Sequence, residues 1–172
     1  AAMNPNDDSW RHAPAATAIE KRVIRWLCDL CGLPETSFGT FVSGGSLANL
    51  TGLKLAINRA LGRDLTRLDA RESDPRLGRL VFYVSGQGHY SFVKAIDILG
   101  LGRGQLRKLP VDDLFRVDLD ALTAALAADR EAGLIPCCVI GIAGTTNTGS
   151  VDKLADLAAI ARAHGCWFHV DA

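Results

Sequence analysis

The chain has 172 residues, enough for one ordinary domain, and its 48% hydrophobic and 22% charged residues are typical of a globular rather than a disordered protein. The 19 Lys and Arg residues balance 19 Asp and Glu residues, so no overall field draws the chain to nucleic acid or to an anionic membrane. No apolar run approaches the ~20 residues that span a bilayer. The start AAMNPNDDSW lacks a secretory signal and an initiator Met, which indicates a cut end.

Five cysteines, an odd number without an export signal, indicate reduced thiols and a cytoplasmic protein. Cys28 and Cys31 have the spacing of a metal or redox pair, but a single such pair inside a helical pattern favours ordinary helix packing. Cys137 and Cys138 are adjacent in a predicted strand, so we expect their side chains to point to opposite faces and to fill the core.

The first part of the chain predicts two helices and an exposed connection. Thr17 and Glu20 have capping-box spacing, although Pro14 indicates an earlier helix start. The predicted segments are a helix from Pro14 to Gly32 with Ile19, Val23, Trp26, Leu27 and Leu30 on one face, a helix over 46–61 followed by Gly62, and a polar connection over 63–78.

From residue 79 onward, strands and helices alternate. The strict alternation predicts crossover units on a mostly parallel sheet, with helices on both faces. The last strand is apolar and lacks a covering helix, so we expect the chain to be part of a longer one. The predicted strands are 79–85, 105–111, 137–144 and 166–172, and the predicted helices are 90–100, 118–132 and 151–165.

Four motifs lie at the carboxyl ends of predicted strands or at adjoining helix starts, where open α/β sheets bind ligands. In SGGSLAN (43–49), Gly44, Gly45 and Ser46 lie at the start of a predicted helix, where free N–H groups and the helix dipole favour a phosphate. The alternative is a plain serine cap after a tight turn. The motif is neither a Walker loop, since no lysine follows, nor a GxGxxG fingerprint.

The other three motifs, SGQGHYS (85–91), GTTNTGSVD (144–152) and HVDA (169–172), supply polar side chains. His89 follows two glycines that leave room for a flat ligand, or it is an ordinary hydrogen-bonded histidine. Thr145 and Thr146 are turn residues or hydroxyl donors. Asp171 ends an apolar strand, where its carboxylate needs a partner such as a protonated ring nitrogen, or it caps the next loop.

Together, an anion cradle, a stacking histidine, threonine hydroxyls and a strand aspartate meet the needs of pyridoxal 5'-phosphate (PLP). Five segments occur in the order found in the group II PLP-dependent amino-acid decarboxylases, which this chain resembles over nearly its whole length. The segments are HAPAATAIEKRVIRWLCDLCGLP, SGGSLANLTGL, GHYSFVKAIDILGLG, GTTNTGSVDKL and FHVDA. The resemblance implies the fold-type I, aspartate-aminotransferase-like architecture. It also implies an N-terminal helical segment (1–34) and the first part of the PLP-binding large domain (35–172).

The resemblance also assigns roles to individual residues. Gly45 and Ser46 match the phosphate-binding pair, His89 the histidine that stacks on the cofactor ring and contacts the substrate, and Thr146 a threonine that contacts the cofactor. Asp171 matches the aspartate that pairs with the pyridine nitrogen and keeps the ring able to accept electrons when CO2 leaves. His89 and Asp171 are the expected catalytic residues, and no metal is expected.

The Schiff-base lysine of the family lies beyond the strand aspartate, and none of the five lysines present has its context. They are Lys21, Lys54, Lys94, Lys108 and Lys153. We therefore expect a PLP-dependent decarboxylase of an L-amino acid that is homodimeric when complete, and a fragment that is inactive alone. The alternatives are another fold-type I PLP enzyme, such as a lyase or aldehyde synthase, and a non-catalytic fragment that binds a partner chain.

Overall fold

The computed structural model describes residues 10–64 and 74–172. The middle of the predicted polar connection, residues 65–73, lies outside them. The chain forms two compact units, Ala1–Ser43 and Gly44–Ala172, which are described separately. The expected division into segments 1–34 and 35–172 stays a prediction.

The first unit is built on helix α1 (Pro14–Leu30), which begins with proline in its first turn, where the missing N–H costs nothing. The helix begins at Pro14, as the proline indicated, so Thr17 lies inside it and forms no capping box with Glu20; the Thr17 hydroxyl donates to the carbonyl of Ala13 at 2.9 Å. Glu20 instead accepts a hydrogen bond from the backbone N–H of Phe41 at 3.0 Å. Gly32, with φ of 66°, follows the helix as predicted.

The apolar face of α1 is largely exposed, and Leu30 is 84% accessible. Cys28 is buried and Cys31 is exposed, and both are free thiols. Over residues 10–64 and 74–172, no group of three or more His, Cys, Asp or Glu side chains is arranged to hold a metal ion. The same residues include no helix that is long and apolar enough to cross a membrane.

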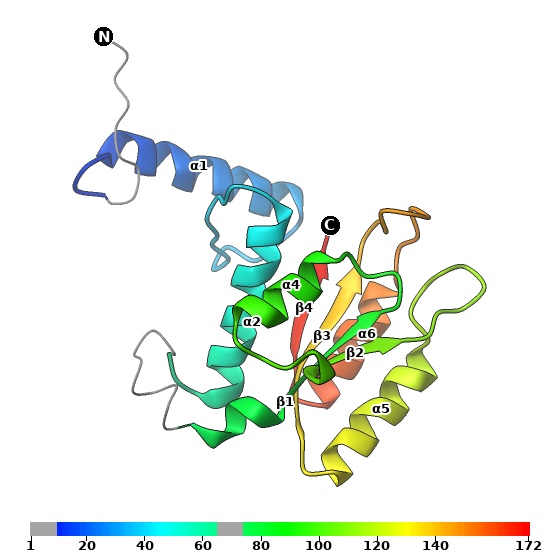
Figure 1. The fold of residues 1–172 in the computed structure, drawn as a ribbon. Helices are drawn as coiled ribbons and strands as arrows, with labels where there is room; N and C mark the ends of the chain where they lie inside the picture. Colours follow the sequence, from blue (N-terminus) through cyan, green and yellow to red (C-terminus); the bar gives the residue numbers. More distant parts are fainter. Residues whose placement is uncertain (1–9, 65–73) are drawn as a thin grey trace. The chain divides into compact units, whose positions relative to one another are not determined.

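The second unit contains a four-stranded sheet in which every neighbouring pair is parallel, as predicted (Figure 1). The strand order is β2-β1-β3-β4, so β4 stands at one edge of the described sheet. Because the strands are parallel, their carboxyl ends share one edge of the sheet. The strands are β1 (Leu80–Ser85), β2 (Leu106–Leu109), β3 (Ile135–Ile142) and β4 (Trp167–Asp171).

Helices cover both faces of the sheet and enclose two hydrophobic clusters (Figure 1). One cluster joins α2 (Gly45–Leu61) and α4 (Ser91–Ile98) to the sheet. The other joins α5 (Leu119–Glu131) and α6 (Leu154–Ala163) to the opposite face. Short 3-10 turns, η1 (Pro75–Arg79) and η2 (Arg103–Gln105), precede β1 and β2. Burial on both faces explains the continuous apolar runs of β1 and β3.

The predicted elements are present with shifted ends, and the largest shift is at the start of α6. This helix begins at Leu154 rather than at residue 151, because Val151 is extended and forms an isolated bridge with Ala143. Asp118 caps α5 by accepting from the backbone N–H groups of Asp120 and Ala121. Gly62 ends α2 in the left-handed conformation, as its position in the sequence predicts.

The expectation that Cys137 and Cys138 face opposite sides of the sheet is wrong. Val81 pairs with Pro136 but Phe82 pairs with Cys138, so Cys137 is an extra residue in a β-bulge. The bulge breaks the two-residue alternation of the strand. Both thiols are therefore buried in the same cluster, beside α2 and α4.

Candidate functional site

The amino end of α2 is exposed, and the backbone N–H groups of Gly45 and Ser46 have no partner among the described residues. Gly44 precedes the helix with φ of 134°, a conformation that favours glycine, and none of the described side chains caps the helix. Gly45 and Ser46 are exposed. A Cβ atom added to Gly45 would meet nothing within 4 Å among the described residues, so the space beside the backbone is free. The free N–H groups and the helix dipole make this end suitable for an anion.

One turn further along α2, Asn49 is buried and joins the helix to the end of β4. Its Nδ2 donates to Oδ1 of Asp171 at 3.0 Å, and its Oδ1 accepts from Nε2 of His169 at 2.8 Å. Asp171 is half-buried, and its Oδ2 accepts no hydrogen bond from the described residues. Burial lowers the pKa of His169, although the Asp171 carboxylate partly opposes this shift.

The same amide of Asn49 reaches the loop that carries His89. Asn49 Nδ2 lies 3.1 Å from Oγ of Ser91, the first residue of α4, and this oxygen lies 2.9 Å from Nδ1 of His89. Ser91 is buried, whereas the imidazole of His89 reaches the surface. His89 and Asp171 are thus connected through two buried polar side chains.

The two threonines of the turn after β3 differ in burial and in hydrogen bonding. Thr145 is buried, its hydroxyl lies 2.5 Å from that of Thr148, and it also accepts from the backbone N–H of Ser150. Thr146 is exposed, and its hydroxyl has no hydrogen-bond partner among residues 10–64 and 74–172. Thr145 therefore closes the turn, and Thr146 is left available to a ligand. The end of this strand touches β4, since the N–H of Ala143 donates to the carbonyl of Asp171 at 2.7 Å.

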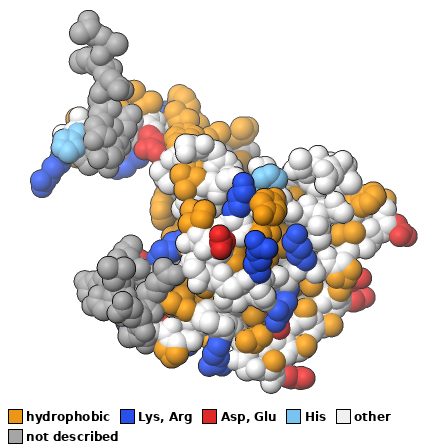
Figure 2. Space-filling model, in the orientation of Figure 1, with side chains coloured by type: hydrophobic (Ala, Val, Ile, Leu, Met, Phe, Trp, Pro, Cys, Tyr) orange, Lys and Arg blue, Asp and Glu red, His pale blue; other side chains and the backbone are white. Residues whose placement is uncertain are grey.

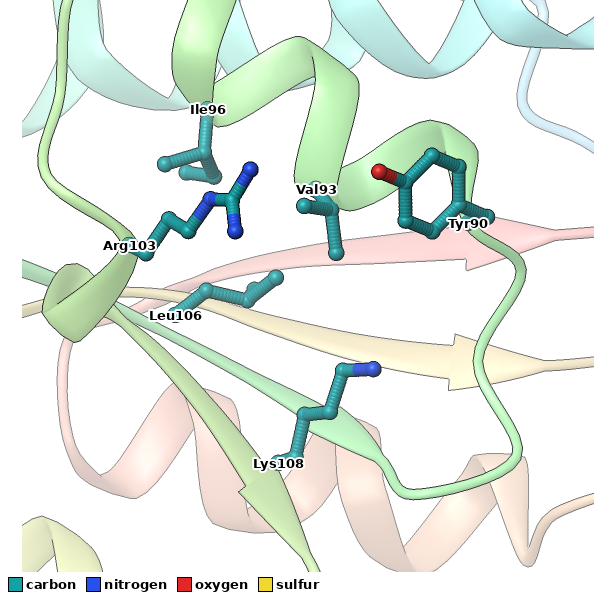
Figure 3. A pocket seen from close by; sticks show the side chains of 6 residues that line it. All are labelled: Tyr90, Val93, Ile96, Arg103, Leu106 and Lys108. Carbon is teal, nitrogen blue, oxygen red and sulfur yellow. The ribbon is translucent and has the colours of Figure 1, made fainter.

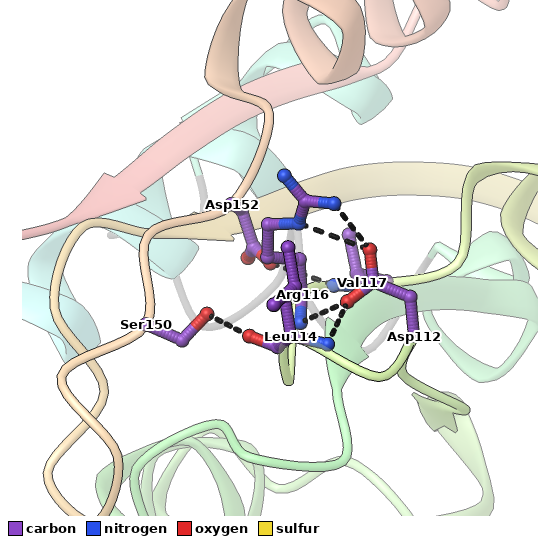
Figure 4. Close-up of polar contacts among 6 residues, drawn as sticks. All are labelled: Asp112, Leu114, Arg116, Val117, Ser150 and Asp152. Atoms are coloured by element: carbon purple, nitrogen blue, oxygen red, sulfur yellow. Dashed lines mark hydrogen bonds and ion pairs between the residues drawn. The ribbon is translucent and has the colours of Figure 1, made fainter.

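A buried carboxylate ties this turn to the loop after β2 (Figure 4). Asp152 accepts from the backbone N–H of Val117 at 2.7 Å with Oδ1 and from that of Ile142 at 2.8 Å with Oδ2. The hydroxyl of Ser150 donates to the carbonyl of Leu114 at 2.7 Å. The loops after β2 and β3 are therefore tied together by the side chains of Asp152 and Ser150.

Close packing of α2 on β4 depends on Gly52. A Cβ atom at this position would lie 2.5 Å from Cε1 of His169, far inside van der Waals contact. The glycine lets the helix approach the ring closely enough for Asn49 to reach both His169 and Asp171.

A hollow of about 320 Å³ lies on the flank of α4 and is separate from this network (Figure 3). Figure 2 shows Lys and Arg side chains gathered on the visible face of the second unit, and two basic residues line the hollow. Asn49 and Asp171 are not among its lining residues, although Tyr90 directly follows His89. The lining residues are Tyr90, Val93, Ile96, Arg103, Leu106 and Lys108.

Sequence patterns alone did not identify four residues that organise this site: Asn49, Ser91, Asp152 and Gly52. The first two lie within quoted motifs, Asn49 one helical turn after Ser46 and Ser91 two residues after His89. Helical spacing puts Asn49 on the same side of the helix as Ser46, one turn further along, and this spacing is the sequence signal that could have identified Asn49. The tertiary contacts of Asp152 and Gly52 left no comparable pattern in the sequence.

A parallel sheet covered on both faces, with polar side chains at its carboxyl edge beside an open helix end, is the arrangement of α/β proteins that bind a phosphate-bearing ligand there. The model of the pyridoxal-dependent decarboxylase conserved domain matches residues 1–172. The chain belongs to this family, as its motifs predicted.

Individual relatives agree with this assignment. The chain is 38% identical over 177 residues to a tyrosine decarboxylase from Oryza sativa subsp. japonica, covering 100% of this chain and 32% of that protein. The crystal structure of the glutamate decarboxylase domain of diaminobutyrate-pyruvate transaminase and L-2,4-diaminobutyrate decarboxylase from Vibrio parahaemolyticus matches with a TM-score of 0.89 and 32% identity, over 98% of this chain and 37% of that one. The Oryza sativa TDC structure with PLP and tryptamine matches with a TM-score of 0.82 and 30% identity, over 95% and 34%.

The chain thus spans about a third of the length of these relatives. The expected fold-type I architecture is confirmed by its similarity to these decarboxylase structures.

Proposed function

We propose that the complete protein is a PLP-dependent decarboxylase of an L-amino acid and that this chain supplies much of its cofactor site. The observation that carries the proposal is the spatial relation between Asp171 and the open end of α2. Asn49, which donates a hydrogen bond to Asp171, lies three residues after Ser46 in α2, a rise of about 4.5 Å along the helix axis. A carboxylate with a free oxygen and an anion-binding helix end are therefore close neighbours.

These two features fit opposite ends of PLP. Oδ2 of Asp171 is free to accept a proton-bearing ring nitrogen, and the backbone N–H groups at Gly45 and Ser46 suit the phosphate. His89 and Thr146, both exposed at the carboxyl edge, are proposed to contact the ring and the cofactor side chain. When bound, PLP supplies the electron sink that loss of CO2 requires.

The residues of this chain contribute binding and orientation. Asp171 holds a proton on the ring nitrogen through its negative charge, and the rigid packing of α2 on β4 keeps this carboxylate in place. The lysine that attaches the cofactor is proposed to lie outside these 172 residues, because none of the five lysines present has the sequence context of the family's Schiff-base lysine. Alone, the 172-residue chain is proposed to be inactive.

The test is Asp171→Asn in the complete protein, a change that keeps the shape and removes the charge. Leaving one member of a hydrogen-bonded charge pair unpaired costs about 2 kcal/mol or more, so we expect PLP retention and CO2 release to fall roughly 30-fold or more. Asp156→Asn, at an exposed position of α6, is the matched control. Normal PLP retention and CO2 release in Asp171→Asn contradict the proposal. Release of ammonia or aldehyde from the unaltered protein, without an amine product, assigns it to another PLP reaction.

Three further properties belong to this proposal. The substrate is an L-amino acid, the substrate class that the names of the similar decarboxylases give for those proteins. The complete protein is a homodimer in the cytoplasm. Size-exclusion chromatography with light scattering and fractionation of the source cells test these two statements.

A further inference from the structure

Four side chains form a continuous hydrogen-bonded line across the site: Asp171, Asn49, Ser91 and His89. The three contacts measure 3.0 Å, 3.1 Å and 2.9 Å. The line joins β4 to α2, α2 to α4, and α4 to the loop before it. Its donor and acceptor directions follow from the chemistry of its members, starting at the carboxylate.

The first step is the orientation of the Asn49 amide. An ionised carboxylate only accepts hydrogen bonds, so the amide must present its NH2 group, and not its oxygen, to Asp171. The amide oxygen then faces His169, which donates from Nε2 at 2.8 Å. Because an amide oxygen only accepts hydrogen bonds, this contact places a proton on Nε2 of His169.

The second step is the direction of the Ser91 hydroxyl. Its oxygen accepts from the NH2 group of Asn49, so its single hydrogen is left for Nδ1 of His89. The backbone N–H of Ser91 also donates to the same nitrogen, at 3.2 Å. Two donors therefore converge on Nδ1 of His89, which must be an unprotonated acceptor.

We propose that Asn49 and Ser91 are positioning residues that hold His89 with Nδ1 as a hydrogen-bond acceptor and the ring proton on Nε2. The carboxylate of Asp171 sets this tautomer through two intervening side chains. Nε2 has no partner among residues 10–64 and 74–172 and is presented to the surface as a hydrogen-bond donor. The role of this donor toward PLP or an amino-acid carboxylate rests on the proposed function, whereas the tautomer itself does not.

The direct test is nitrogen NMR of the complete protein labelled with 15N-histidine, recorded with and without PLP. His89→Gln identifies the signals of His89 by difference. We expect the shift of an unprotonated ring nitrogen at Nδ1 and of a protonated one at Nε2. A proton on Nδ1 overturns the inference. A proton on Nε2 in a protein that binds no PLP supports the tautomer and refutes the proposed function instead.

Asn49→Asp tests the line with little change of shape, because it replaces the donor NH2 by an acceptor oxygen. The Ser91 hydroxyl then turns to donate to the new carboxylate, and its oxygen is free to accept from Nδ1 of His89. We expect His89 to move toward the tautomer protonated on Nδ1. We also expect PLP affinity to fall about tenfold or more, because two carboxylates now oppose each other. Asn58→Asp on the same helix, hydrogen-bonded to Lys54, is the matched control and should change neither readout.

Ser91→Ala provides the same readout if Asn49→Asp fails to fold. It removes one of the two donors to Nδ1 and leaves only the backbone N–H, so the form protonated on Nδ1 should become detectable. A His89 signal that stays unchanged in this variant shows that the line does not set the tautomer. Ser37→Ala in the first unit is the control for loss of a serine hydroxyl.

Discussion

Asn49 and Asp171 are 122 positions apart in the sequence, yet Asn49 Nδ2 donates to Asp171 Oδ1 at 3.0 Å. This contact connects the helix whose open end suits an anion to the strand end whose carboxylate suits a cationic ring. It also forces the Asn49 oxygen toward His169. The geometry of the site therefore depends on how closely α2 packs on β4.

The first prediction concerns this packing. In Gly52→Ala, the new Cβ would lie 2.5 Å from the His169 ring, so α2 must move away from β4. Overpacking of this kind typically costs about 1–3 kcal/mol, and we expect the midpoint of denaturant unfolding to fall and PLP affinity to weaken. Gly104→Ala, where a Cβ meets nothing within 4 Å, is the matched control. An unchanged unfolding midpoint for Gly52→Ala would show that the close contact is not required.

The second prediction concerns the buried carboxylate of Asp152. In Asp152→Asn, only one acceptor oxygen remains for the N–H groups of Val117 and Ile142, and the new NH2 group faces one of these donors. An unsatisfied buried donor costs about 1–3 kcal/mol, which should lower the thermal midpoint. We expect hydrogen exchange to accelerate selectively at residues 112–118 and 143–152. Uniform acceleration across the second unit would contradict a local role.

The third prediction concerns the loss of folding stability in acid. The pKa of Asp112 is lowered from 3.8 to about 2, mainly by a hydrogen bond from the Arg116 side chain and to a smaller extent by one from the Arg116 backbone N–H. Because the folded pKa lies below the unfolded one, this ion pair contributes stability above pH 3.8 and loses it as the pH falls through about 2. Asp112→Asn should therefore flatten the loss of stability over that interval, measured by urea unfolding at stepped pH. Asp113→Asn, at the exposed neighbouring position, should retain the slope of the unaltered protein.

The fourth prediction concerns thiol reactivity. Burial raises the pKa of Cys137 to about 12 and of Cys166 to about 11, and it raises that of Cys138 well above its ordinary value. Only the thiolate reacts readily, so these three cysteines should resist Ellman's reagent in the native protein while exposed Cys31 reacts. Peptide mapping by mass spectrometry identifies the labelled sites, and Cys31→Ser is the control. Rapid native labelling of Cys138 would contradict its burial.

The sequence predicted the elements of the second unit well, because their signals are local. Alternation of apolar strands with helices indicated a parallel sheet, and Gly62 marked the end of α2 through its backbone conformation. Local rules failed where an unexpected neighbour intervened. The two-residue alternation expected at Cys137 and Cys138 is broken by the bulge in β3.

The candidate site, too, was only partly predictable from the sequence. The sequence by itself determined the family, the order of the motifs and the chemical types at the carboxyl edge, because each motif is a short run of adjacent residues. Only the tertiary structure decided which side chains hold His89 and Asp171 in place. Asn49, Ser91 and Asp152 act through hydrogen bonds between distant segments, and these bonds exist only after the hydrophobic faces of α2 and α4 have packed on the sheet.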